Sequence, residues 1–114
     1  MRRPERVAEF LRQEIAQIVG YELDDPRVAM VTVTDVRVSE DLRDARVFVT
    51  VQGDDREHEL ALRALRNAAP YVRRQLSFSL NLRHTPELHF VRDRAEEQAE
   101  RVDLLLETIG RDET

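Results

Sequence analysis

Apolar residues recur at helical spacing through the first part of the chain. Between Arg3 and Tyr21 they fall on one side of an α-helix, at positions 7, 10, 11, 15, 18 and 19. Gly20 stands where such a helix is expected to end, and Pro26 in the segment Asp24–Arg27 favours a turn. The pattern predicts a helix over residues 3–21, followed by a turn.

The next two segments have the two-residue period of β-strands. Within residues 28–39, Val31 and Val33 share one parity, whereas Val36 and Val38 share the other. Both pairs can face one core only if an extra residue lies between them, so we expect a bulge near Thr34–Asp35. Residues 44–52 alternate cleanly, and the short link between the two segments predicts an antiparallel hairpin.

Helical spacing returns over residues 56–68 and is interrupted by Pro70. Proline disfavours the helical conformation at the preceding residue but suits the first position of a helix, so we expect a bend and a new helix over residues 70–79. Residues 87–92 can form a third strand. Residues 94–109 form an amphipathic pattern, in which we expect Leu105 and Leu106 to be packed. We expect residues 110–114 to be a disordered tail after Gly110.

This order of elements indicates one domain, residues 1–109, of the α+β class, with helices packed on one face of a small three-stranded sheet. Arg37, Arg46 and Thr50 occupy strand positions, so we expect the other face of the sheet to be partly solvated. The chain of 114 residues, of which 41% are apolar, is long enough for one modest core.

Composition narrows the chemistry that the chain can perform. The chain has no cysteine, which removes disulfides, thiol chemistry and cysteine-based zinc sites. His58, His84 and His89 lack the spacing of metal ligands, and we interpret them as surface residues. The glycines are too scattered for a phosphate loop. We therefore expect no enzyme, no bound metal and no cofactor. We find no signal-peptide pattern and no membrane-spanning run, so we expect neither secretion nor a membrane span.

The charge of the chain is unevenly distributed, although its net value is −5. All its Lys+Arg residues are arginine, which binds phosphate through two parallel hydrogen bonds and stacks on bases. The segment from Leu60 to Pro86 contains no acidic residue, and we call it the basic window. It is a candidate anion-binding surface, and the alternative is a merely solvated helix face.

Two neighbouring arginines in the basic window, Arg73 and Arg74, occupy the first turn of the helix predicted from Pro70. Free N–H groups at a helix N-terminus attract anions, so arginines beside them make a candidate phosphate site. Tyr71 is open to two interpretations, as a stacking platform or as a core residue.

Several segments, taken together, resemble the ribosome-binding factor A family of bacterial small-subunit assembly factors. The resemblance covers nearly the whole chain. Its specific segments are the opening helix from Arg6-Val7 to Ile18, Asp25-Pro26-Arg27, Val31 to Ser39, Asp41-Leu42 with Ala45-Arg46-Val47, Tyr71-Val72-Arg73 with Leu76, and Leu82-Arg83 with Pro86-Glu87-Leu88 and Phe90. No segment is diagnostic alone, but their order and spacing are specific.

The resemblance implies a type II KH-like fold, in which a kinked helix pair marked Ala-x-Gly replaces the usual Gly-x-x-Gly loop. Here that position reads Ala68-Ala69-Pro70. Pro70 preserves a bend but adds a ring and removes an N–H, so phosphate contact would depend more on arginine side chains. The expected RNA-binding residues are Arg63, Arg66, Asn67, Ala68, Ala69, Pro70, Arg73, Arg74 and Arg83, with Arg2, Arg3 and Arg6 as a secondary contact.

The resemblance also implies a function. The protein would bind the free small ribosomal subunit and its ribosomal RNA near the 5′-terminal helix, late in maturation, and leave before translation. It would be cytoplasmic and relevant to cold shock. We expect a monomer with neither a small-molecule substrate nor a membrane as partner. The alternative is a protein–protein adaptor that docks through the apolar stripe of the last helix.

Overall fold

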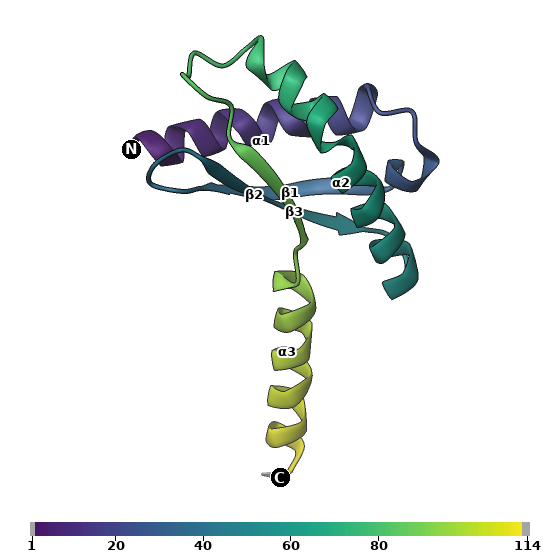
Figure 1. The fold of residues 1–114 in the computed structure, drawn as a ribbon. Coiled ribbons are helices and arrows are strands. Elements are labelled where there is room, and N and C mark those ends of the chain that lie inside the picture. The colour runs from purple at the N-terminus through teal and green to yellow at the C-terminus, as the bar shows by residue number, and fades with distance from the viewer. Residues whose placement is uncertain (1, 113–114) are drawn as a thin grey trace.

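The computed structural model describes residues 2–112, and the side chains of all of these except residues 96, 100, 103 and 107–112. The described elements form a three-stranded sheet and three α-helices (Figure 1). In chain order they are α1 (Arg3–Tyr21), the short 3-10 helix η1 (Pro26–Val28), β1 (Val31–Val38), β2 (Asp44–Val51), α2 (Asp55–Ser77), β3 (Glu87–Arg92) and α3 (Ala95–Asp112). The predicted bounds of α1 and β3 are confirmed.

The sheet has the order β1-β2-β3. Strands β1 and β2 form the expected antiparallel hairpin, and β3 lies parallel to β2. The register of the hairpin shifts between Val33 and Asp35, which confirms the predicted bulge. Because of this extra residue, Val33 and Val36 are both buried, and Val31 and Val38 both pack against the same core.

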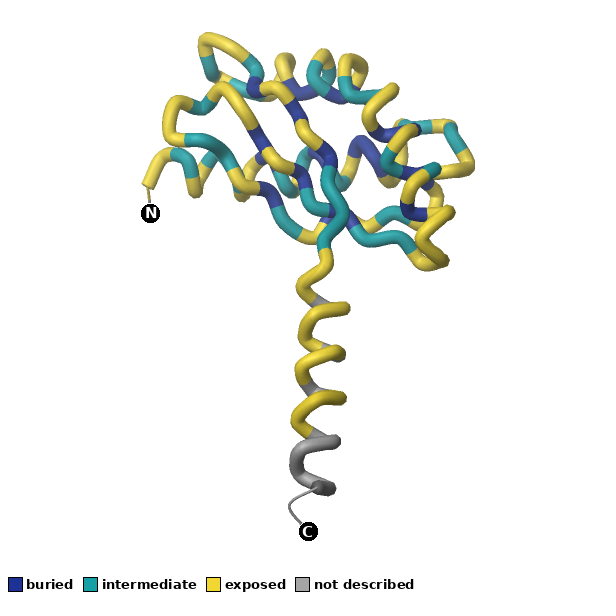
Figure 2. The backbone as a smooth tube through the Cα atoms, turned by 60° about the horizontal axis from the view of Figure 1, so that its bottom comes forward, coloured by how far each residue is buried: buried dark blue, intermediate teal, exposed yellow. Residues whose placement is uncertain are grey.

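Helices α1 and α2 cover one face of the sheet, and the core lies between the two layers. Its fully buried side chains include Leu11 and Ile15 from α1, Leu65 and Leu76 from α2, and Phe90 from β3. Exposed and half-buried residues alternate with buried ones along the strands (Figure 2). Arg37 and Arg46 are exposed on the uncovered face, as the strand pattern predicted. The architecture is α+β and consistent with a type II KH-like domain.

Helix α2 continues through Pro70, so the two separate helices that we expected are one helix. Its start is fixed by Asp54, whose side chain accepts a hydrogen bond from the Glu57 N–H at 2.9 Å. Leu65, Val72 and Leu76 lie on one stripe and are all fully buried, on both sides of Pro70. We infer that burying this stripe outweighs the backbone hydrogen bond that proline removes.

Helix α3 projects away from the sheet and from the other helices (Figure 1). The expected packing of Leu105 and Leu106 is wrong, because each is 60% exposed. The helix also passes Gly110 and runs to Asp112; the rest of the predicted tail, residues 113–114, lies outside the described residues. The base of α3 is tied to the domain by Arg92, which pairs with Glu97 at 2.6 Å and with Asp55 at 2.8 Å. No described helix is long and apolar enough to cross a membrane.

Candidate nucleic-acid interface

One side of α2 carries polar and basic residues at helical spacing. Arg63, Asn67, Pro70, Arg74 and Ser77 follow one another at intervals of three or four residues and are all exposed. We call this stripe, together with its neighbour Arg66, the outer face of α2. Its only ion pair among the described residues joins Arg63 to Glu59 at 3.8 Å, with both side chains largely exposed. Most of the cationic charge is therefore available to a partner.

The predicted phosphate site at a helix N-terminus does not exist in the structure. Because α2 continues through Pro70, residues 71–74 lie inside a helix, where N–H groups bond to carbonyls of the preceding turn. Ala68 and Ala69 are only half-exposed, and Ala69 packs against the core. The outer face therefore offers side chains, above all guanidinium groups, and no cradle of backbone donors.

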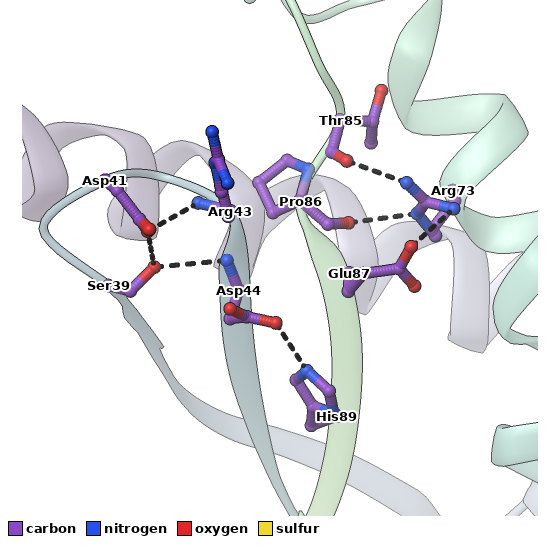
Figure 3. A network of polar contacts seen from close by, with 9 residues as sticks. All are labelled: Ser39, Asp41, Arg43, Asp44, Arg73, Thr85, Pro86, Glu87 and His89. Carbon is purple, nitrogen blue, oxygen red and sulfur yellow. Dashed lines mark hydrogen bonds and ion pairs between the residues drawn. The ribbon is translucent and has the colours of Figure 1, made fainter.

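Arg73 has a structural role that the sequence did not reveal (Figure 3). Its guanidinium donates hydrogen bonds to the carbonyl oxygens of Thr85 at 2.8 Å and Pro86 at 3.1 Å, and it pairs with Glu87 at 3.2 Å. These contacts hold the segment that enters β3 against α2. Arg73 is thus directed toward the domain and away from the outer face, and its role in binding phosphate stays a prediction that this geometry does not favour.

Two other residues of the basic window also link elements of the domain. A guanidinium nitrogen of exposed Arg66 donates to the Phe90 carbonyl of β3 at 3.2 Å. The Tyr71 hydroxyl donates to Glu22 at the end of α1, at 3.2 Å. Loss of solvent and the nearby Glu22 carboxylate raise the pKa of Tyr71. Tyr71 is 41% exposed, so it is neither a core residue nor a free stacking platform.

The loop after α2, residues 78–86, lies beside the N-terminal half of α1. Arg6, Val7 and Phe10 of α1 and residues 79–82 line a shared hollow of about 230 Å³. The tertiary structure thus brings Arg6 close to the loop that carries Arg83. Arg2 is instead paired with Glu40 of the β1–β2 connection. Arg3 is exposed.

Sequence reasoning missed one exposed residue of this loop, Phe78. Its exposed fraction is 78%, which is high for a large apolar side chain. The sequence pattern could have identified it. Leu76 and Leu80, which are four residues apart, both belong to the apolar stripe that faces the core. Phe78 lies between them at a spacing that turns its side chain away from this stripe.

The uncovered face of the sheet is a weaker anion site. Arg37 and Arg46 lie over the ring of Phe48, at 5.7 and 5.8 Å from its centre. Carboxylates lie among them, however: Asp35 pairs with Arg37 at 3.4 Å, and Asp44 with His89 at 2.9 Å. This face therefore mixes both signs of charge, in contrast to the outer face of α2.

The interpretation of all three histidines as surface residues is wrong for His58. It is 7% exposed, and its Nδ1 lies 2.8 Å from the Asp54 carbonyl oxygen. His58 belongs to the start of α2 and takes no part in the candidate interface.

Comparison with known proteins places this architecture in one family. A family model described as ribosome-binding factor A matches residues 3–106. The ribosome-binding factor A of Thermomicrobium roseum is 52% identical over 107 residues, which cover 94% of this chain and 83% of that protein. The crystal structure of ribosome-binding factor A from Thermus thermophilus matches with a TM-score of 0.73 and 30% identity, over 81% of this chain and 97% of that one.

A second structural match comes from one relative in a complex. It is a homology model of Thermus thermophilus ribosome-binding factor A fitted into a cryo-EM map of a 30S complex, and it matches with a TM-score of 0.64 and 32% identity, over 76% of this chain and 91% of that one. The sequence profile, the identity over nearly the full length and the shared fold agree. The chain is a member of the ribosome-binding factor A family.

Proposed function

We propose that this protein is a non-enzymatic assembly factor that binds the free small ribosomal subunit through its ribosomal RNA. The observation that carries the proposal is the outer face of α2, which is exposed, basic and part of a window without acidic residues. Guanidinium groups bind phosphate oxygens through strong, often paired, charge-assisted hydrogen bonds. The 30S complex of the Thermus thermophilus relative supports the same partner.

The mechanism is conformational, and no bond is made or broken. In this proposal, four exposed arginines, Arg63, Arg66, Arg74 and Arg83, contact phosphates of the RNA. Contacts of this kind hold RNA helices in a relative position without reading their sequence. We propose that the protein acts in the cytoplasm as a monomer, late in maturation of the subunit and near the 5′ end of its RNA, takes no small-molecule substrate, and leaves before translation.

The test is co-sedimentation with purified small subunits at several salt concentrations. If the four arginines neutralise phosphates, affinity falls with salt at a log–log slope of about −3, using the single-strand coefficient. Arg63→Glu and Arg74→Glu, singly and together, should weaken binding and flatten the slope. Both residues are exposed, so the free energy of unfolding should change by less than about 0.5 kcal/mol.

The matched control is Arg101→Glu, an equal charge reversal at an exposed position of α3. It should bind like the parent. If the Arg63/Arg74 double variant folds normally and binds like the parent at every salt concentration, the outer face of α2 is a solvated surface and the proposal fails. Equal losses in the control and the test variants would indicate a general charge effect.

A second candidate function, as a protein–protein adaptor, is supported by α3. Val102, Leu105 and Leu106 are exposed by 53%, 60% and 60%, and acidic residues outnumber arginines along this helix. The acidic residues repel RNA, and the exposed apolar stripe suits an apolar groove on a protein partner, a contact that salt does not weaken. Salt-insensitive binding to one purified protein, abolished by Leu105→Asp, would favour this function.

A further inference from the structure

The backbone around Phe78 is held by hydrogen bonds, although most of the Phe78 side chain is in water. The turn after α2 is closed by hydrogen bonds from the N–H groups of Ser79 and Leu80 to the Leu76 carbonyl, both at 3.0 Å. Leu80 then packs against the core. At the other end of the loop, Arg73 holds the carbonyls of Thr85 and Pro86. The backbone of the loop is therefore anchored at both ends, and it needs little ordering on binding.

The residues around Phe78 are basic or neutral, and their side chains can donate hydrogen bonds to an anion. Arg74 lies one helical turn before it on the same side of α2, and Arg83 and His84 are exposed in the same loop. Among the described residues, no ion pair involves Arg74 or Arg83. On α1, Arg6 lines the adjoining hollow, whereas Glu9 is paired with Arg12 at 2.7 Å and Glu5 lines a different groove, against β1.

We infer that Phe78 is a stacking platform for an unpaired base of ribosomal RNA, with Arg74 and Arg83 binding the phosphates on either side. Aromatic rings flanked by cationic side chains are the usual means of binding single-stranded nucleic acid. A second copy of this chain that docked symmetrically through the same loop would bring like charges together and be repelled. The inference rests on the proposed function and adds that the RNA at this site is single-stranded.

The direct test uses fluorescence, because the chain contains no tryptophan. F78W introduces a single indole at the proposed stacking position, and its emission should be quenched on titration with small subunits and with their purified ribosomal RNA. The matched control is Y21W, at the opposite end of α1, where Tyr21 is 87% exposed. It should bind equally well without quenching. Quenching of F78W by subunits but not by purified RNA would place a protein against Phe78 and overturn the inference.

Affinity measurements separate the inference from the proposed function. F78L should lower affinity for small subunits about tenfold, or about 1.4 kcal/mol, at both low and high salt, since stacking does not release counterions. Its salt slope and thermal midpoint should equal those of the parent, and F78Y should restore affinity. If F78L binds like the parent while Arg63/Arg74→Glu does not, the stacking role fails and the proposed function stands. If the charge variants also bind like the parent, both fail.

Discussion

Arg73 and Arg74 are adjacent in sequence but should behave as different kinds of residue when each is replaced by alanine. The Arg73 guanidinium bonds to two loop carbonyls and pairs with Glu87 (Figure 3), whereas Arg74 is exposed. Arg73→Ala removes all three contacts and leaves two carbonyls without their donor. Arg74→Ala removes none.

The magnitude follows from the contacts. A hydrogen bond from a charged donor contributes about 1.5–3 kcal/mol when buried. The Arg73 side chain is 35% exposed, so we take about 1 kcal/mol for each of its two bonds to carbonyls. The pair with Glu87, whose side chain is 62% exposed, adds less than about 1 kcal/mol. We therefore expect Arg73→Ala to lower the free energy of unfolding by about 2–3 kcal/mol, and Arg74→Ala by less than about 0.5 kcal/mol.

The assay is urea denaturation followed by circular dichroism. With a slope of about 2 kcal/mol per molar urea, the midpoint of Arg73→Ala should fall by about 1–1.5 M, and that of Arg74→Ala should stay at the parent value. Binding should show the opposite pattern, because Arg74→Ala should reduce the salt slope by about 0.7 and Arg73→Ala should leave it unchanged. Equal midpoints for the two variants would refute the structural role assigned to Arg73.

Three further predictions concern α2, α3 and the turn before β1. Pro70→Ala restores an N–H inside α2, so it should raise the thermal midpoint. The helical circular dichroism signal should rise only slightly, because residues 55–77 are already helical. A large rise in that signal would show that α2 is broken in solution. Leu105→Ala and deletion of residues 110–114 should each change the free energy of unfolding by less than about 0.5 kcal/mol. The control Leu65→Ala, at a residue that is 0% exposed, should lower it by about 2–5 kcal/mol. A thermal midpoint several degrees lower for Leu105→Ala or for the deletion would indicate that α3 packs on the domain. Hydrogen bonds from the Arg27 side chain and N–H lower the pKa of the Asp25 carboxyl from 3.8 to about 2. The ionised carboxylate therefore stabilises the fold above its ordinary pKa, and this stabilisation is lost as pH falls toward 2. Asp25→Asn should lower the thermal midpoint at pH 7 but not at pH 2, and an NMR titration of Asp25 near 3.8 would contradict this.

The residues that sequence alone placed correctly are those whose local pattern decides their conformation. The helical period of residues 3–21 and the alternation of residues 87–92 predicted α1 and β3. The change of parity between Val33 and Val36 predicted the bulge, because only an extra residue lets both side chains reach one core. The absence of acidic residues from Leu60 to Pro86 marked the basic surface before any geometry was known.

Tertiary packing decided the features that local rules predicted wrongly or not at all. Pro70 locally favours a break, yet Leu65 and Val72 on its two sides are buried together, and we infer that this burial keeps α2 continuous. The parallel pairing of β3 with β2 brings the loop before β3 against α2, and only then does Arg73 meet the Thr85 and Pro86 carbonyls while Arg74 faces water. The amphipathic pattern of α3 looked like that of a packed helix, since periodicity records an apolar face but not the surface that covers it. Sequence thus determined the elements and the sign of the surface charge, and long-range packing determined which arginines remain free to bind a partner.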